Sequence, residues 1–503
     1  MSQKKIGIFI SYLNLIVSTL INVFLTPVLI RYLGDVDYSI YKVMQSFSGP
    51  LVIFNLGIST IVTRSIVKYR TTNDYSEKEK KNALALSMLS SFVISIVVVL
   101  VGLAMCMTIP TVYGKAYTAE QTGLAQIIFL MFLASTVIHL LTDAFSGCIA
   151  GNEKYVISSA ISLSKNIIKV ILMIVLFSLD CNVIAVVGVD LVISLSVFVF
   201  SAAYSVLKLK ELPKLTYFDK KQLIEMLSFA VAILLQAIVN QVNNNVDIVI
   251  LGAFVLDKKI ITMYSSALVI YNAYNSILSV ISGFFLPDAT KLIANNASGK
   301  DLTDLVIKPG RFNAIVAVGI IFGFLAFGRD FIAIWIGEQY INTYYVVLML
   351  IVPVTIPLVE NVAIAILDAS LKRVYRSVIL VIMAVINIAF SLLLISFMGF
   401  WGAALGTLIS LVLGHGVLMN VYYAKNFKMQ IFRMFREIFS GILPAGVVAC
   451  ALCIPLVLLL KNGVVTFIVC CCTFVILYAV FLWLFGLRKS EKALVKGFVI
   501  KRR

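Results

Sequence analysis

The sequence reads VISSAISLSKNIIKVILMIVLFSL over residues 156–179, DCN over 180–182 and VIAVVGVDLVISLSVFVFSAAYSV over 183–206. A helix needs about 20 mostly apolar residues to cross roughly 30 Å of hydrocarbon. Each long stretch therefore predicts one membrane span, and the three residues between them predict a tight helical hairpin. Helices are expected because the backbone polar groups of a span must be satisfied inside the segment.

The composition extends this pattern to the whole chain. Hydrophobic residues make up 61% of the 503, charged residues make up 13%, and the mean hydropathy is +1.04. A soluble protein of this length would need polar surfaces around several cores, so we predict an all-α integral membrane protein. The first apolar stretch has no small-residue cleavage site and is expected to stay as a span. The fourteen predicted spans are 8–30, 40–63, 83–109, 123–146, 156–179, 183–206, 223–250, 261–287, 310–336, 344–367, 377–398, 401–424, 438–460 and 464–487.

Lysine and arginine residues predict the orientation of these spans. Of the 41, 32 lie in alternate segments, seven lie in the others, and Lys165 and Lys169 lie within a span. Because cytoplasmic loops are rich in lysine and arginine, both termini are expected on the cytoplasmic side of a bacterial inner (plasma) membrane. The net charge of +17 is then explained by topology and anionic headgroups, without nucleic acid. The eight cysteines are expected to be buried thiols, and no metal site is expected.

Short loops exclude several classes of function. None reaches thirty residues, so the sequence predicts no nucleotide-binding domain, no phosphate-binding P-loop and no large external domain. A membrane-embedded enzyme such as a polymerase or ligase is disfavoured for this reason. No cofactor is expected.

A weak internal repeat indicates two similar halves. Lys154 and Lys372 each open a span, and Gly188 and Gly406 each lie in the following span, with the same offset of 218 residues. Two sets of six spans that both begin on the cytoplasmic side predict parallel lobes. The predicted domains are 1–219 (spans one to six), 220–437 (spans seven to twelve), 438–487 (the last two spans) and 488–503 (a basic cytoplasmic tail).

Three short motifs resemble those of a known family. They are PVLIRYLGDVDY at residues 27–38, DIVILG at 247–252 followed by Tyr264-Ser265, and FWGAALGT at 400–407. The sequence resembles the Wzx-type O-antigen and capsule flippases of the multidrug/oligosaccharidyl-lipid/polysaccharide exporter (MOP) superfamily. This resemblance implies a MATE-like fold and transport by alternating access.

The resemblance also implies a cargo and partners. The cargo would be an undecaprenyl-diphosphate-linked oligosaccharide, moved across the membrane for the biosynthesis of O-antigen (as part of lipopolysaccharide), capsule or exopolysaccharide. A polysaccharide polymerase and a chain-length regulator would work nearby. A MATE-like multidrug or cation antiporter of the same superfamily is the alternative, and lumen-facing acids and aromatic residues would favour it.

Cations inside the spans are the first candidates for binding the cargo. Lys165 and Lys169 lie one helical turn apart on a face that also carries Ser158 and Ser162. They either face a lumen, where they would bind a diphosphate, or extend to the cytoplasmic surface. Lys42, at the edge of the second span, is expected in the same cavity.

Amides in several spans predict a wet cavity that holds the sugar hydroxyls. The alternative is that they bond neighbouring helices together. The candidates are Asn14, Asn22, Asn240, Asn243 and Asn272.

Acids in the spans are candidates for coupling or charge balance. Glu360 follows Pro353 and Pro357, which free backbone groups where a transport helix bends. It would take protons or sodium from an ion gradient, or neutralise Lys165 or Lys169. Asp247 and Asp190 are the other candidates. His139 and His415 are expected to be structural.

Overall fold

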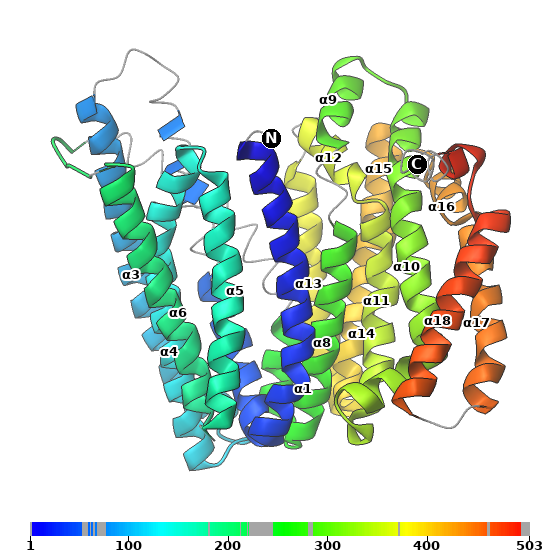
Figure 1. Ribbon diagram of the computed structural model, residues 1–503, viewed down its shortest axis with the longest axis horizontal. Coiled ribbons are helices and arrows are strands. Elements are labelled where there is room, and N and C mark those ends of the chain that lie inside the picture. Colours follow the sequence, from blue (N-terminus) through cyan, green and yellow to red (C-terminus); the bar gives the residue numbers. More distant parts are fainter. Residues whose placement is uncertain are drawn as a thin grey trace. The chain divides into compact units, whose positions relative to one another are not determined.

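A computed structural model describes residues 3–52, 59–60, 62–63, 66–67, 77–179, 182–211, 213–218, 220, 245–279, 285–370, 373–459 and 463–493. Every regular element in these ranges is helical, as Figure 1 shows. The chain divides into two compact units, Met1–Ser265 and Ser266–Arg503. The predicted all-α fold is confirmed.

The first unit contains long helices, and its most extensive packing joins helices that are not neighbours in the chain. Helix α1 covers the first predicted span and residues 40–52 of the second, and its only non-helical residue is Gly34, with φ 68°. A positive φ suits glycine, because it has no Cβ to clash. The elements are α1 (Gln3–Val52), α3 (Glu77–Tyr113), α4 (Ala119–Gly151), α5 (Tyr155–Ser178), α6 (Val183–Ala203), the π-helix η2 (Tyr204–Lys208) and the helix Asn245–Phe254.

The second unit begins within α8 and contains shorter, more broken elements. They are α8 (Lys258–Ser279), α9 (Leu286–Ala294), α10 (Gly299–Trp335), η4 (Glu338–Tyr340), α11 (Thr343–Val359), α12 (Val362–Ala369), α13 (Arg373–Met398), α14 (Phe400–Leu411), η5 (Val412–Met419), α15 (Asn420–Phe427), α16 (Ile431–Phe439), α17 (Ile442–Leu459), α18 (Val464–Phe481) and η6 (Leu482–Gly486).

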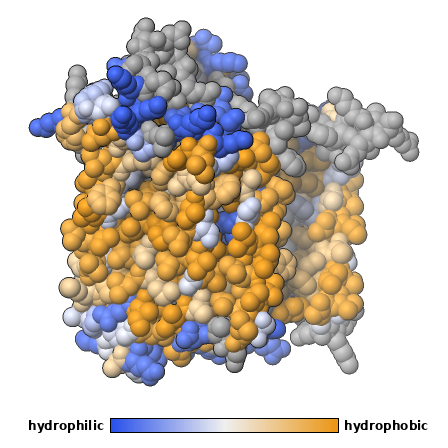
Figure 2. Space-filling view, turned by 60° about the vertical axis from the view of Figure 1, so that its left-hand side comes forward, coloured by the Kyte–Doolittle hydropathy of each residue, from blue (hydrophilic) through white to orange (hydrophobic). Residues whose placement is uncertain are grey.

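Nine helices of the described residues are long and apolar enough to cross a membrane, and α16 with α17 form a tenth candidate bent by 41°. The helices Asn245–Phe254 and Thr343–Val359 are apolar but shorter. Parts of the predicted spans 40–63, 223–250, 261–287 and 438–460 lie outside the described residues. Figure 2 shows one face on which hydrophobic side chains form a broad band between hydrophilic edges.

Glycines allow the α13–α14 hairpin to be tight. Helix α13 ends at Met398, α14 begins at Phe400, and Gly399 turns the chain with φ 58°. A Cβ on Gly402 would lie 2.3 Å from the carbonyl carbon of Leu394, and one on Gly406 would lie 2.3 Å from Ser391 Oγ. Small residues four apart let two helix backbones approach closely.

Candidate functional site

An ion pair joins α5 to α6 in the first unit. Lys169 Nζ lies 2.7 Å from Asp190 Oδ1, and the two side chains are 21% and 19% exposed. Lys169 lies fourteen residues into α5, about 21 Å from its first residue at 1.5 Å per residue. Its ammonium therefore bonds an acid inside the unit. Asp190, which the sequence proposed for charge balance, is that acid.

Other charged side chains surround this pair. Lys42 and Tyr41 of α1 interact electrostatically with both Lys169 and Asp190. Lys165 interacts electrostatically with Lys169 and Asp190, and also with Asp143 of α4. Four of the residues proposed from the sequence, Lys42, Lys165, Lys169 and Asp190, thus lie within electrostatic range of the Lys169–Asp190 pair. We call these four residues and Asp143 the lysine cluster; three cations face two carboxylates in it.

Neutral groups complete the surroundings of the lysine cluster. Lys42 Nζ donates to Gln45 Oε1 at 3.3 Å and lies 5.4 Å from the ring centroid of Tyr41. His139 Nε2 lies 3.1 Å from Ser194 Oγ, one turn along α6 from Asp190. A partly dehydrated setting strengthens every charge interaction in it. The arrangement can bind an anion that competes with Asp190.

The amides of the first unit divide between two roles. Asn166 of α5 donates to Asn14 at 2.9 Å, and Ser11 lies 2.8 Å from Ser159, so both contacts join α1 to α5. Asn22 is exposed on α1. Asn240 and Asn243 lie outside the described residues. Asn14 therefore holds two helices together, whereas the side chain of Asn22 is accessible.

A cavity of about 350 Å³ opens between α5 and α6 beside the lysine cluster. Lys165 lines it together with Ser164 and Ser196, and its other walls are apolar. Pockets of roughly 300 to 1,000 Å³ with a few convergent polar groups are typical of small-molecule sites. Lys165 therefore belongs both to the cluster and to a cavity.

Glu360 forms a separate polar site in the second unit. It ends α11 after Pro353 and Pro357, and is only 3% exposed. Asn420 lies close to it, and Glu360 Oε2 has no hydrogen-bond partner among the described residues. Asn420 directly follows the π-helix η5, and such π segments often mark functional sites. A buried carboxylate with an unsatisfied oxygen is suited to take up a proton or a cation.

The remaining proposed residues lie in less distinctive surroundings. Asp247 is 4% exposed and accepts a 2.6 Å hydrogen bond from the hydroxyl of Tyr264. Asn272 is exposed on α8. His415 lies within η5. Nothing in these contacts distinguishes Asp247 from an ordinary buried acceptor.

Comparison with known proteins assigns the family. The family model described as "Polysaccharide biosynthesis protein" matches residues 5–293, which is more than half of the chain. The chain belongs to this family. A comparison with curated proteins gives no match.

Solved structures with a similar fold cover most of this polysaccharide biosynthesis protein. Lipid II flippase MurJ in an inward closed conformation has a TM-score of 0.73 at 16% identity, over 94% of this chain and 97% of its own. An inward-facing MATE multidrug resistance transporter of the MOP superfamily has a TM-score of 0.61 at 11% identity, over 86% and 98%. The eukaryotic MATE transporter AtDTX14 has a TM-score of 0.57 at 11% identity, over 87% and 99%. At these identities the likeness shows the fold alone.

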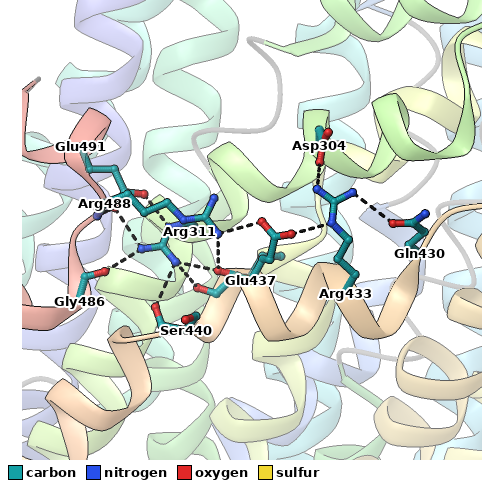
Figure 3. Close-up of polar contacts among 10 residues, drawn as sticks. Asp304, Arg311, Gln430, Arg433, Glu437, Ser440, Gly486, Arg488 and Glu491 are labelled. Atoms are coloured by element: carbon teal, nitrogen blue, oxygen red, sulfur yellow. Dashed lines mark hydrogen bonds and ion pairs between the residues drawn. The ribbon is translucent and has the colours of Figure 1, made fainter.

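This family member also has a buried arginine that the sequence did not single out. Arg311 of α10 is 1% exposed and forms a double hydrogen bond with Glu491, at 2.6 Å and 3.1 Å. It donates to the carbonyl oxygens of Gly486, Glu437 and Ser440 at 2.7, 2.7 and 3.1 Å. Figure 3 shows these partners around its guanidinium. All five of its N–H groups are used.

Neighbouring charges extend this arrangement along α16. Glu437 accepts from Arg433 at 2.6 Å and from Arg488 at 3.0 Å, and Arg433 also reaches Asp304 at 2.7 Å (Figure 3). Burial by itself raises the pKa of Glu491, but hydrogen bonds from Arg311 and from the Arg488 backbone bring that pKa below its usual value. The signal in the sequence was Glu491, the one acid in the basic segment 488–503.

Proposed function

We propose that this protein moves a lipid-linked oligosaccharide across the bacterial inner membrane for surface polysaccharide biosynthesis. The observation that carries the proposal is the lysine cluster, which gathers three cations near Asp190 on helices long and apolar enough to cross a membrane. Intramembrane ionisable residues mark ion or substrate pathways by default. Membership of the polysaccharide biosynthesis family and the MurJ-like fold support the same function.

The chemistry of such a cargo suits the cluster. An undecaprenyl diphosphate carries negative charge at its head, while its tail is at home in lipid. Lys169 and Lys165 are one turn apart, so one diphosphate can contact both ammonium groups. Charge-assisted hydrogen bonds to phosphate are about twice as strong as neutral ones. The diphosphate would replace Asp190 beside Lys169, and the exposed amide of Asn22 would meet the sugar.

Coupling to a gradient of protons or sodium is proposed at Glu360. Its carboxylate is buried, and one oxygen has no hydrogen-bond partner in the described part of the chain. A buried carboxylate that carries a negative charge without a bound proton or cation costs free energy. Binding of a proton or cation to Glu360 would therefore change the stability of the surrounding helix break. Alternating access would then link this occupancy to exposure of the cargo site.

An antiporter of the MATE type is the second candidate. The MATE-like fold and the buried acids Glu360 and Asp247 favour it. Its cargo would be a cation, and the excess of lysines over carboxylates in the lysine cluster repels cations. A non-enzymatic role agrees with both candidates.

Export of polysaccharide from cells that carry Lys169 variants tests the proposal. Lys169→Gln should abolish surface polysaccharide and leave lipid-linked units on the cytoplasmic face, whereas Lys169→Arg should retain part of the export. Lys169→Gln with Asp190→Asn controls for the acid left unpaired, and Lys300→Gln controls for loss of an exposed charge. Normal export from both variants that lack the lysine, at equal amounts of protein in the membrane, would refute the assignment.

The proposed orientation places both termini in the cytoplasm. Alkaline phosphatase fused after Arg70 or Lys214 should be inactive, because the enzyme folds only outside the cytoplasm. Activity at either position would reverse the orientation. The proposed partners are a polysaccharide polymerase and a chain-length regulator, which would receive the cargo after transfer.

A further inference from the structure

The cavity between α5 and α6 is a groove with mostly apolar walls. Its polar side chains lie at one height along the helices, which we call the polar level. Ile157, Ala160 and Phe200 line one part of the groove, and Ile168 and Ile193 line the other. Phe200 and Ile168 are 52% and 47% exposed, so the groove is open along its side. From Ile157 to Ile168 it follows eleven residues of α5, about 16 Å of helix at 1.5 Å per residue. A channel of this shape suits a hydrocarbon chain.

The polar level lies between the two apolar parts. Ser164 and Lys165 of α5 and Ser196 of α6 line the groove there. Lys165 is only partly exposed, and the carboxylates of Asp143 and Asp190 interact with it from the cluster side. An ammonium and two hydroxyls beside hydrocarbon match an amphiphile that carries a negative charge.

The position of Lys165 along α5 identifies the class of amphiphile. Lys165 lies ten residues from the first residue of α5, about 15 Å along a helix that crosses about 30 Å of hydrocarbon. The phosphate of an ordinary phospholipid stays at the membrane surface and does not reach this level. A lipid whose head is being carried across the membrane does reach it.

We infer that the α5–α6 groove binds the isoprenoid chain of the cargo lipid while its diphosphate lies at Lys165. This inference rests on the proposed function and adds a position for the tail. The groove joins the lysine cluster through Lys165, so the head can pass to Lys169 while the chain stays in contact with apolar side chains. A large side chain placed in the groove should therefore weaken binding of the isoprenoid chain and leave binding of a soluble diphosphate unchanged.

Binding of undecaprenyl diphosphate to the purified full-length protein tests the groove. Ala160→Phe fills the apolar part, and Ala134→Phe adds the same side chain at an exposed position of α4 that does not line the groove. We expect about tenfold weaker binding for Ala160→Phe, wild-type binding for Ala134→Phe, and no effect of either on inorganic pyrophosphate. Phosphatidylglycerol is the phospholipid control and should bind the two variants equally.

Labelling of the wild-type protein by a photoreactive lipid gives a result that does not depend on the folding of a variant. A polyprenyl diphosphate with a diazirine in its isoprenoid chain should label peptides that contain residues 157–168 or 193–200. Labelling confined to other segments, or equal lipid binding by wild type and a folded Ala160→Phe, would overturn the groove while leaving the proposed function intact. Absence of any polyprenyl diphosphate binding by wild type would instead reject the proposed function.

Discussion

Arg311 Nε lies 2.6 Å from Glu491 Oε1, although 180 residues separate them in the chain. The pair joins α10 to the segment after α18. The remaining N–H groups of the same guanidinium donate to carbonyl groups at the ends of α16 and η6. Cations at helix C-termini are favourable, since the helix dipole is negative there. Arg311 thus ties the ends of α16 and η6, and Glu491 beyond them, to α10 within the second unit.

Replacing Arg311 should be strongly destabilising. Arg311→Gln would leave Glu491 charged and buried without its partner, a change that costs about 3–5 kcal/mol in comparable pairs. Thermal unfolding of the purified protein, or resistance to proteolysis of α17 and α18, measures the loss. Arg433→Gln is the matched control, because Arg433 is 33% exposed and ion pairs in contact with water contribute little to stability. Equal losses for the two variants would show that burial of Arg311 does not matter.

Stability should fall in acid through Glu491. The pKa of Glu491 is lower in the folded protein than in the unfolded chain, where a glutamate titrates near about 4.3. Its contribution is therefore complete above that pH and is lost as the pH falls toward the folded pKa. The difference in melting temperature between wild type and Glu491→Gln should shrink between pH 6 and about pH 3.5. A difference that stays constant over this range would contradict the assignment.

Close packing of α13 on α14 should make Gly402 intolerant of any side chain. Gly402→Ala would place a Cβ 2.3 Å from a backbone carbon of α13, so the hairpin must open. Overpacking of this kind costs about 1–3 kcal/mol or more. Gly123→Ala in α4 meets nothing within 4 Å, and there alanine should raise stability by up to about 1 kcal/mol. Opposite shifts of the two melting temperatures are the expected result.

Glu360→Gln should keep or increase stability while reducing transport. The glutamine has the same shape and removes a buried charge whose second oxygen has no partner among the described residues. Asp247→Ala should instead cost about 1–3 kcal/mol, because the Tyr264 hydroxyl loses its acceptor. Melting temperatures and polysaccharide export, measured on the same preparations and strains, separate the two effects. A large loss of stability in Glu360→Gln would make Glu360 a structural residue.

The candidate site was predictable in its residue types more than in its contacts. Lys165 and Lys169 stood out because charge is rare in a span, and they do lie with Lys42 and Asp190 in one cluster. Asn14 was proposed either to meet the cargo or to bond a neighbouring helix, and its amide bonds Asn166 across two helices. Arg311 looked like an ordinary loop cation, because nothing near it in sequence indicates that Glu491 will reach it.

The sequence by itself determined that the chain is helical and lies in a membrane, because hydropathy adds up over about twenty consecutive residues and needs no distant partner. It also determined the α13–α14 hairpin, since Gly399, Gly402 and Gly406 act between two helices that are adjacent in the chain. Only the tertiary structure decided that Asp190 neutralises Lys169 and that Glu491 meets Arg311. Ion pairing depends on the distance between charges in space and on how far water is excluded, and separation along the chain fixes neither quantity.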